Sequence, residues 1–205
     1  LKVGIIGCGG IAFEKHMPGL AKLDGVELIA FCNRTPSKAE MAAAEFGEKE
    51  SFIYQDYSEL LKNPAVDVVH ICTPNDTHAE ISIAAMKADK DVMVEKPMAV
   101  NAEEAEKMYE TSQKTGQKLS VSYQYRFNSE NLYLKKLIEE DELGEIYFAK
   151  SLALRRRGVP TWGTFLDKKV QGGGPLIDIG THALDLTLWL MDNYQPKIVL
   201  GNVFN

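Results

Sequence analysis

Residues 3–12 of the chain read VGIIGCGGIA. A short apolar run leads directly into the pattern G-x-G-x-x-A, with Gly7, Gly9 and Ala12 in its three fixed positions. In such a turn the first glycine permits a tight bend, the second lets a pyrophosphate approach the backbone, and the small third residue keeps helix and strand close. The segment therefore predicts a strand, a phosphate-binding turn and a helix N-terminus that favours an anion. A glycine-rich turn without a ligand is the alternative.

Apolar runs alternate with helical patterns from the N-terminus to about residue 122. Several runs are rich in Val and Ile and most are apolar on both faces, which is typical of strands buried in a parallel sheet. The expected strands lie at residues 3–6, 26–32, 51–54, 66–72, 91–94 and 118–121. This alternation predicts a doubly wound α/β domain.

The helices between these strands have recognisable ends. Thr35 can cap one helix, and Gly47 follows its last turn. Asn101 can cap another, which Gly116 ends. A third helix is expected over residues 76–88.

The pattern changes after residue 122. We expect an amphipathic helix, a long strand, a strongly apolar helix and a final strand-like run at residues 130–142, 145–156, 176–191 and 197–204. These elements predict a second α+β domain with an open sheet, over residues 123–205 after a first domain over 1–122. Because the last run ends with the chain, we expect the second domain to be incomplete.

Composition and charge restrict the class of protein. The 205 residues are 45% hydrophobic and 25% charged, which is ordinary for a soluble globular protein. The net charge of -6 argues against a nucleic-acid binder, which needs a basic face. No run approaches the roughly 18 apolar residues of a membrane span, and no secretory signal is recognisable. The 3 cysteines have no zinc-ligand spacing and suggest no disulfide framework, so a cytoplasmic location is expected.

The end of the second expected strand bears on the choice between NAD and NADP. A carboxylate at this position binds the ribose 2′-hydroxyl and repels a 2′-phosphate, but residues 28–36 contain no acidic side chain. Asn33 can bind a hydroxyl without repelling a phosphate, and Arg34 can pair with a 2′-phosphate. The sequence therefore slightly favours NADP. Arg34 as a solvated turn residue is the alternative.

Glu95, Lys96 and Pro97 follow an apolar strand directly. Ligands of such sheets bind beyond the carboxyl ends of the strands, so Lys96 is expected to face the ligand. Its ammonium can stabilise an alkoxide that develops as a hydride leaves. A lysine in a surface loop is the alternative.

The apolar helix that follows the glycines at 172–174 has one polar face. Asp178, His182 and Asp185 are spaced i, i+4 and i+7 along it. Burying a carboxylate and an imidazole without partners costs on the order of several kcal/mol, so we expect this face to line a cleft. His182 can act as a general base, with Asp178 orienting it or binding substrate. A core histidine bonded to a neighbouring carboxylate is the alternative.

The order and spacing of these motifs resemble the Gfo/Idh/MocA family of glucose–fructose oxidoreductase and inositol dehydrogenase. The resemblance covers nearly the whole chain, and its matching segments are residues 7–12, 73–78, 95–97, 125–127 and 172–182. It implies a Rossmann domain followed by an open-sheet α/β domain. It also implies NAD(P)-dependent oxidation or reduction of a ring carbon in a sugar, a cyclitol or a related polyol. Members of the family are usually longer than this chain.

The resemblance implies roles for individual residues. The catalytic residues would be Lys96, Asp178 and His182. The motifs and the resemblance together place the dinucleotide on Gly7, Gly9, Gly10, Ile11, Asn33, Arg34, Thr73, Pro74, Asn75, His78, Glu95 and Lys96. Substrate contacts are expected from Tyr125, Arg126, Trp162, Asp178 and His182. Of the other histidines, His16 is expected to be an ordinary residue of the first helix, with an approach to the cofactor as the alternative, and His70 is expected to be a hydrogen-bonded core residue.

Three function classes follow from these features. The first is a dehydrogenase or reductase, the second a dinucleotide-binding regulator without turnover, and the third a glycosidase that oxidises its substrate transiently with bound NAD. The presence of Lys96, Asp178 and His182 favours an enzyme over a regulator. An open sheet edge invites pairing with another chain, so a homo-oligomer is expected, without nucleic-acid or membrane partners.

Overall fold

The computed structural model describes residues 1–154, 157–158, 160–161 and 163–202. They divide into two compact units. The first comprises Leu1–Ser122 with Pro160–Gly174, and the second Tyr123–Val159 with Pro175–Asn205. The expected division after residue 122 takes no account of the segment Pro160–Gly174, which packs with the first unit. None of the helices in the described ranges is long and apolar enough to cross a membrane.

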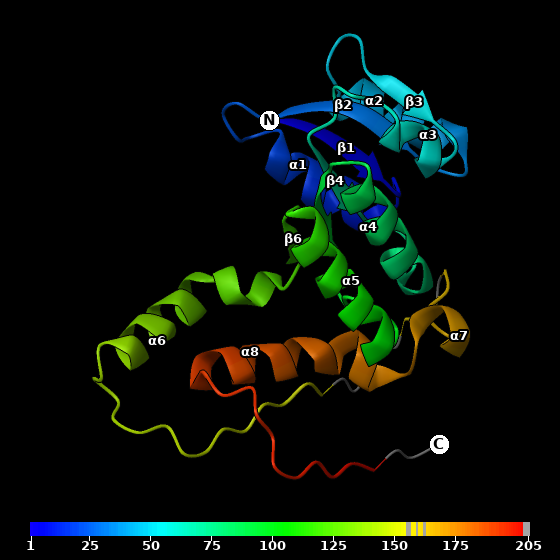
Figure 1. Ribbon diagram of the computed structural model, residues 1–205. Coiled ribbons are helices and arrows are strands. Elements are labelled where there is room, and N and C mark those ends of the chain that lie inside the picture. Colours follow the sequence, from blue (N-terminus) through cyan, green and yellow to red (C-terminus); the bar gives the residue numbers. More distant parts are fainter. Residues whose placement is uncertain (155–156, 159, 162, 203–205) are drawn as a thin grey trace. The chain divides into compact units, whose positions relative to one another are not determined.

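The first unit is built on a six-stranded parallel sheet (Figure 1). Its strands are β1 (Lys2–Ile6), β2 (Glu27–Cys32), β3 (Phe52–Tyr54), β4 (Val68–Ile71), β5 (Asp91–Val94) and β6 (Leu119–Val121). They follow the order β3-β2-β1-β4-β5-β6, and every neighbouring pair is parallel. This is the strand order of a dinucleotide-binding doubly wound sheet, and it confirms the predicted fold class.

Helices connect the strands and cover both faces of the sheet. They are α1 (Met17–Leu20), α2 (Pro36–Phe46), α3 (Tyr57–Leu61), α4 (His78–Lys87) and α5 (Ala102–Thr115), with α7 (Lys168–Gln171) from the later segment. A π-helical turn (Ala12–His16) precedes α1, and a 3₁₀ turn (Asn75–Thr77) precedes α4. As predicted, Asn101 caps α5 by accepting the N–H of Glu104 at 2.9 Å. Thr35 occupies the same position on α2, but its side chain makes no capping hydrogen bond.

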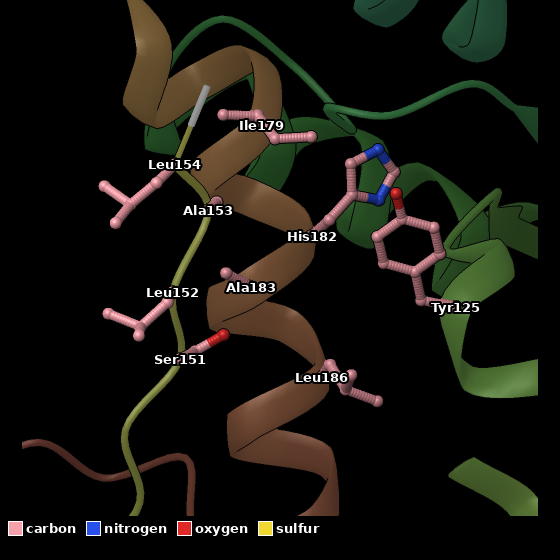
Figure 2. Close-up of a pocket in the computed structure, with 9 residues that line it drawn as sticks. All are labelled: Tyr125, Ser151, Leu152, Ala153, Leu154, Ile179, His182, Ala183 and Leu186. Atoms are coloured by element: carbon pink, nitrogen blue, oxygen red, sulfur yellow. The ribbon is translucent and has the colours of Figure 1, made fainter. Parts of the chain in front are cut away.

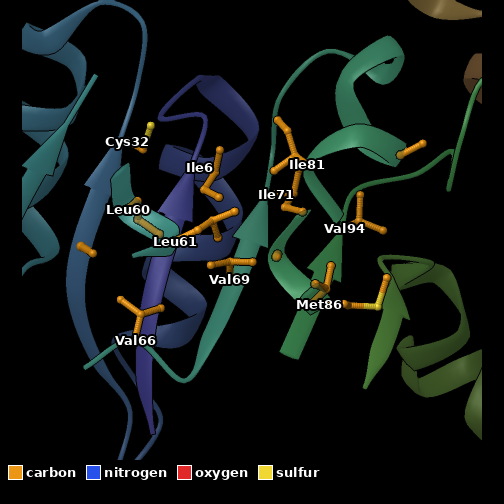
Figure 3. Close-up of a cluster of buried hydrophobic side chains, with 14 of the residues drawn as sticks. Ile6, Cys32, Leu60, Leu61, Val66, Val69, Ile71, Ile81, Met86 and Val94 are labelled. Carbon is orange, nitrogen blue, oxygen red and sulfur yellow. The ribbon is translucent and has the colours of Figure 1, made fainter. Parts of the chain in front are cut away.

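The core of the first unit lies in two layers, one on each face of the sheet. Val3 and Ile5 of β1 are buried with Met17 and Phe31 in the layer under α1 and α2. Ile6 belongs to the other layer, which contains residues of α3, α4 and α5 (Figure 3). Complete burial of such side chains contributes about 1.5–3 kcal/mol each, which explains why runs apolar on both faces form this sheet.

The second unit is helical in its described residues. A 3₁₀ turn (Gln124–Phe127) leads into α6 (Ser129–Glu139), and a π-helical turn (Leu176–Gly180) leads into α8 (Thr181–Met191). Helices α6 and α8 pack against each other. Both predicted helices of this region are therefore present, although the second begins with a wider turn.

The predicted strands of the second unit were wrong as far as the structure describes them. Residues 145–154 and 197–202 adopt no regular structure, and their apolar side chains are largely exposed, for example Leu154 and Leu200. A strand is stable only when a neighbour satisfies its backbone hydrogen bonds, and these runs pair with no other described segment. Arg155, Arg156, Trp162 and residues 203–205 lie outside the described residues.

Candidate functional site

The glycine turn after β1 has the geometry that its sequence predicts. Gly7 has φ +95°, and a Cβ there would lie 2.7 Å from the carbonyl oxygen of Cys72. By contrast, no atom lies within 4 Å of a Cβ placed on Gly9, and only a Glu14 carboxylate oxygen, at 3.8 Å, approaches one on Gly10. The chain thus requires a glycine at the bend and leaves open space above the second glycine. That space fits a pyrophosphate held by backbone N–H groups.

The parallel sheet brings several predicted site residues to one edge. The carboxyl ends of parallel strands lie at the same edge, so Gly7, Asn33, Thr73 and Lys96 follow β1, β2, β4 and β5 there. The strand order reverses between β1 and β4, which is where ligands of such sheets bind. The first unit therefore presents its phosphate turn and its candidate catalytic lysine at the same edge of the sheet, at the ends of β1 and β5, with β4 between them.

The side chain of Asn33 connects the turn after β2 to the glycine turn through a hydrogen bond. Its Oδ1 accepts the N–H of Cys8 at 3.1 Å, and its Nδ2 donates to the carbonyl oxygen of Thr35 at 3.0 Å. The amide is therefore already engaged within the protein. The neighbouring Arg34 is exposed, and only its backbone carbonyl has an internal partner among the hydrogen bonds described, Gln55 Nε2 at 3.2 Å. Of the two residues predicted to bind the ribose end, Arg34 is the more exposed, and Asn33 is part-exposed.

His78 is completely buried and joins two loops at the strand ends. Its ring nitrogens lie 2.8 Å from the carbonyl oxygen of Pro97 and 3.0 Å from that of Thr73. These contacts tie the loop after β4 to the loop after β5, where the Lys96–Pro97 peptide is cis. The ring does not reach the surface, so the predicted cofactor contact of His78 is replaced by a supporting role. Thr73 and Pro74 remain part-exposed in the same loop.

Asn75 links the loop after β4 to α7. Its Nδ2 donates to Gln171 twice, at 2.8 Å to the side-chain oxygen and at 3.1 Å to the backbone carbonyl. Next to this link, Gly172 has φ +78°, and a Cβ on it would lie 2.7 Å from Cβ of Val100. The start of the glycine run at 172–174 is therefore shaped by close packing within the first unit, against Val100.

Glu95 and Lys96 follow β5. The Glu95 carboxylate lies 2.7 Å from Nε2 of His16 and accepts the backbone N–H of Lys96 at 3.2 Å. Burial alone would raise the pKa of Glu95, but the hydrogen bonds from His16, Ser122 and the Lys96 backbone hold it below its ordinary value. Glu95 is thus an ionised support whose side chain is 12% exposed, and the neighbouring Lys96 is also part-exposed.

In the second unit, His182 lies on α8 beside two tyrosines. The rings of Tyr125 and His182 have centroids 4.7 Å apart, and the Tyr123 ring meets His182 edge-on at 6.4 Å. His182 is only 6% exposed. It lines a pocket of about 360 Å³ with Tyr125 and Ser151, and the other lining residues are apolar (Figure 2). An imidazole beside a phenol in mainly apolar surroundings suits a proton-transfer group.

Asp185 and Arg126 form an ion pair in the same unit. Nε of Arg126 lies 2.8 Å from one carboxylate oxygen, and a terminal guanidinium nitrogen contacts the other. The guanidinium carbon also lies 5.8 Å from the Tyr123 ring centroid and 5.9 Å from that of Trp189. Two-point pairing and ring contacts fix the guanidinium in place, so Arg126 supports α8 where a substrate contact was predicted. Trp162, the other predicted contact, is outside the described residues.

Family models match almost the whole chain. Residues 1–123 match the model described as an oxidoreductase family with an NAD-binding Rossmann fold, and residues 131–201 match the Gfo/Idh/MocA C-terminal domain. The chain belongs to the Gfo/Idh/MocA family. The resemblance carried by its motifs is thereby confirmed.

Relatives within the Gfo/Idh/MocA family include sugar enzymes. D-glucoside 3-dehydrogenase of Escherichia coli K12 is 38% identical over 204 residues, which are 100% of this chain and 58% of that protein. Aldose-aldose oxidoreductase from Caulobacter crescentus, complexed with glycerol, has 30% identity and a TM-score of 0.80 over 94% of this chain and 58% of its own. A 3-ketoreductase from Actinomadura kijaniata with NADP has 27% identity and the same TM-score of 0.80, covering 94% and 57%. The chain thus spans less than two thirds of these relatives.

Two features of this Gfo/Idh/MocA chain escaped the sequence reasoning. His16, His70 and Glu95 form a hydrogen-bonded chain, and Asp185 pairs with Arg126. Their members are 54 to 79 residues apart in sequence, so no helical or strand period connects them. The one available signal was the presence of polar residues in apolar runs, since a buried polar group needs a partner.

Proposed function

We propose that this protein is an NAD(P)-dependent oxidoreductase that transfers a hydride between nicotinamide and a hydroxyl-bearing ring carbon of a sugar, a cyclitol or a related polyol. The observation that carries the proposal is that the open glycine turn and Lys96 both lie at the carboxyl edge of the parallel sheet, at the ends of β1 and β5. The glycine turn suits a dinucleotide pyrophosphate, and Lys96 supplies a cation beside the strand ends where the ligand binds. The names of the sugar-enzyme relatives support the substrate class.

The chain's own residues divide the work of the proposed reaction. A bound nicotinamide supplies the hydride acceptor or donor. His182, which lines the pocket beside Tyr125, takes the proton from the substrate hydroxyl as a general base. Asp178 orients His182 or holds a substrate hydroxyl. The Lys96 ammonium stabilises the negative charge that develops on the substrate oxygen.

The proposed cofactor is NADP, with NAD as the alternative. Arg34 is exposed at the end of β2 with no acidic residue beside it, so a 2′-phosphate meets a cation and no repelling carboxylate. The engagement of Asn33 with Cys8 and Thr35 supports this choice, because its amide is already committed. The relative from Actinomadura kijaniata was solved with NADP.

A panel of sugars and cyclitols, run with NAD and NADP separately, tests the proposed function. Growth of reduced-nicotinamide absorbance with a polyol in the panel is the expected result. If the protein binds the dinucleotide but no compound in the panel reduces it, the regulator hypothesis is favoured instead. A protein that retains NAD tightly and cleaves glycosides without net reduction would be the glycosidase.

A further inference from the structure

Three polar side chains inside the first unit form a chain that the proposed reaction does not use. Nε2 of His16 lies 2.7 Å from Oε1 of Glu95, and Nδ1 of His16 lies 3.2 Å from Nδ1 of His70. The His16 and Glu95 side chains are 9% and 12% exposed. His16 lies in the π-helical turn before α1, His70 lies in β4, and Glu95 directly follows β5. Residues from three separate elements thus meet in one largely buried chain of polar contacts, His70–His16–Glu95.

The charge states of these side chains determine which atom donates in the hydrogen bond between His16 and Glu95. Glu95 is ionised, because the hydrogen bonds it accepts outweigh the effect of burial and hold its pKa below the ordinary value. A carboxylate accepts only, so Nε2 of His16 carries the hydrogen of the 2.7 Å contact. Burial, together with the proximity of His16, lowers the pKa of His70 to about 4, so His70 is neutral near pH 7. His16 is thus held on one side by a carboxylate and on the other by a neutral ring.

The other oxygen of Glu95 faces the backbone of the candidate catalytic residue. Oε2 accepts the N–H of Lys96 at 3.2 Å, and the hydroxyl of Ser122 also bonds to the carboxylate. Without the His16 hydrogen bond, a largely buried carboxylate would lose its strongest donor and would protonate or rotate. Either change disturbs the backbone from which the Lys96 side chain extends.

We propose that His16 is a positioning residue for Lys96, acting through the Glu95 carboxylate to fix the Lys96 peptide at the end of β5. This inference rests on the proposed function, since it gives the fixed peptide a catalytic purpose. His16 itself touches neither substrate nor dinucleotide in this role. Displacing a reacting group by about 1 Å costs on the order of a hundredfold in rate, so a small loss of order at Lys96 is measurable.

Two substitutions at His16 separate the effect of its hydrogen bond to Glu95 from the effect of filling the space that the ring occupies. His16→Leu fills the space without a donor, whereas His16→Gln retains an amide N–H directed at Glu95. In the intact enzyme we expect His16→Leu to lower kcat by about ten- to a hundredfold with little change in dinucleotide Kd, and His16→Gln to recover most of it. Met17→Ala is the matched control: it removes a fully buried neighbour, lowers Tm and leaves kcat unchanged.

The pH dependence of kcat gives a readout that a purely structural role would not move. Among the described residues, the titratable side chains near Glu95 are those of His16, His70, Cys72 and the adjacent Lys96. Losing the His16 donor raises the pKa of Glu95, so the acid limb of the His16→Leu profile moves to higher pH. His16→Gln returns the limb toward its original position. If His16→Leu does not fold, His16→Asn replaces it, because its shorter amide falls short of Glu95.

Hydrogen exchange of the Lys96 amide tests the same link without turnover. Exchange is expected to be about tenfold faster in His16→Leu than in the original protein or in His16→Gln. If no substrate is turned over by any form but this amide responds as expected, the hydride-transfer function fails and the His16–Glu95–Lys96 link stands. If kcat, its acid limb and Lys96 exchange are all unchanged in His16→Leu, the inference is overturned and the proposed function is untouched.

Discussion

At the scale of single residues, two glycines of one turn serve different ends. Gly7 is constrained by the protein itself, through φ +95° and the nearby Cys72 carbonyl. No atom lies within 4 Å of a Cβ placed on Gly9, so the surrounding protein does not require a glycine there, and the proposed pyrophosphate contact is what the smallness of Gly9 would serve. The same motif thus contains one glycine that the fold requires and one whose role is proposed to be binding.

Alanine at each glycine should separate folding from binding. Gly7→Ala is expected to lower the free energy of unfolding by about 3 kcal/mol, because the new methyl group meets backbone in an unfavourable φ region. Gly9→Ala should leave Tm nearly unchanged and weaken dinucleotide binding by about tenfold or more. Thermal unfolding and dinucleotide titration measure the two effects. If the Gly9→Ala variant binds dinucleotide as tightly as the original protein, the pyrophosphate does not bind at this turn.

Lys96 should matter for rate and little for affinity. Lys96→Ala is expected to lower kcat by about a hundredfold, because the charge on the substrate oxygen loses its cation. Dinucleotide Kd should change by less than about threefold. Lys87→Ala, at an exposed site on α4, is the control and should behave like the original protein. Equal losses of affinity and rate would assign Lys96 to cofactor binding.

At the scale of elements, the N-cap positions of α2 and α5 can be compared directly. Asn101 accepts the Glu104 N–H at 2.9 Å, whereas Thr35 makes no side-chain bond to its helix. Asn101→Ala should therefore lower the free energy of unfolding by about 1 kcal/mol, and Thr35→Ala by much less. Urea unfolding of the two variants measures the difference. Equal effects would show that the Asn101 hydrogen bond adds nothing.

Local pattern predicted the elements whose stability is local or whose burial is complete. All six strands of the first unit were predicted, because runs such as residues 66–72 are apolar on both faces. The expected strand at 145–156 depends on a pairing partner, which its own residues do not specify. The π-helical turns at Ala12–His16 and Leu176–Gly180 were not predicted either, since they differ from an α-helix in winding and not in apolar pattern.

The candidate site was predicted in position better than in role. The motif positions for Gly7, Gly9 and Lys96 follow from strand ends, which the sequence reveals. His78 and Arg126 were assigned to ligands, because a motif does not show whether a polar side chain already has a buried partner. Their partners, the Pro97 carbonyl and Asp185, lie 19 and 59 residues away.

At the scale of the whole molecule, His70 makes stability depend on pH. Its pKa is about 4 in the folded protein, and about 6.5 is expected when unfolded. Below about pH 6.5 the imidazole of His70 is protonated in the unfolded chain but stays neutral in the folded protein. The free energy of unfolding therefore falls as the pH falls toward about 4. Between pH 7 and pH 5 the loss should be on the order of 1–2 kcal/mol.

Urea unfolding at the two pH values measures this contribution. His70→Asn removes the titrating ring and should flatten the dependence. Should the variant and the original protein lose equal stability on acidification, His70 is not the source.

The link from Asn75 to Gln171 should hold α7 against the first unit. Asn75→Ala removes two hydrogen bonds, and we expect faster trypsin cleavage at Lys168 and Lys169. Asn63→Ala, which breaks contacts elsewhere in the same unit, is the control. Unchanged cleavage in Asn75→Ala would mean that packing at Gly172 alone secures the segment.

The placement of Pro160–Gly174 with the first unit has a consequence for how such a protein can be cut and recombined. The chain passes between the two units after Ser122, before Pro160 and after Gly174. A gene cut once at residue 122 would separate the sheet from a segment that belongs to it, leaving Asn75 without Gln171 and Val100 without Gly172. Modular exchange of the nucleotide half therefore calls for two exchanged pieces, and lineages that shuffled this half by a single crossover would have had to replace that packing.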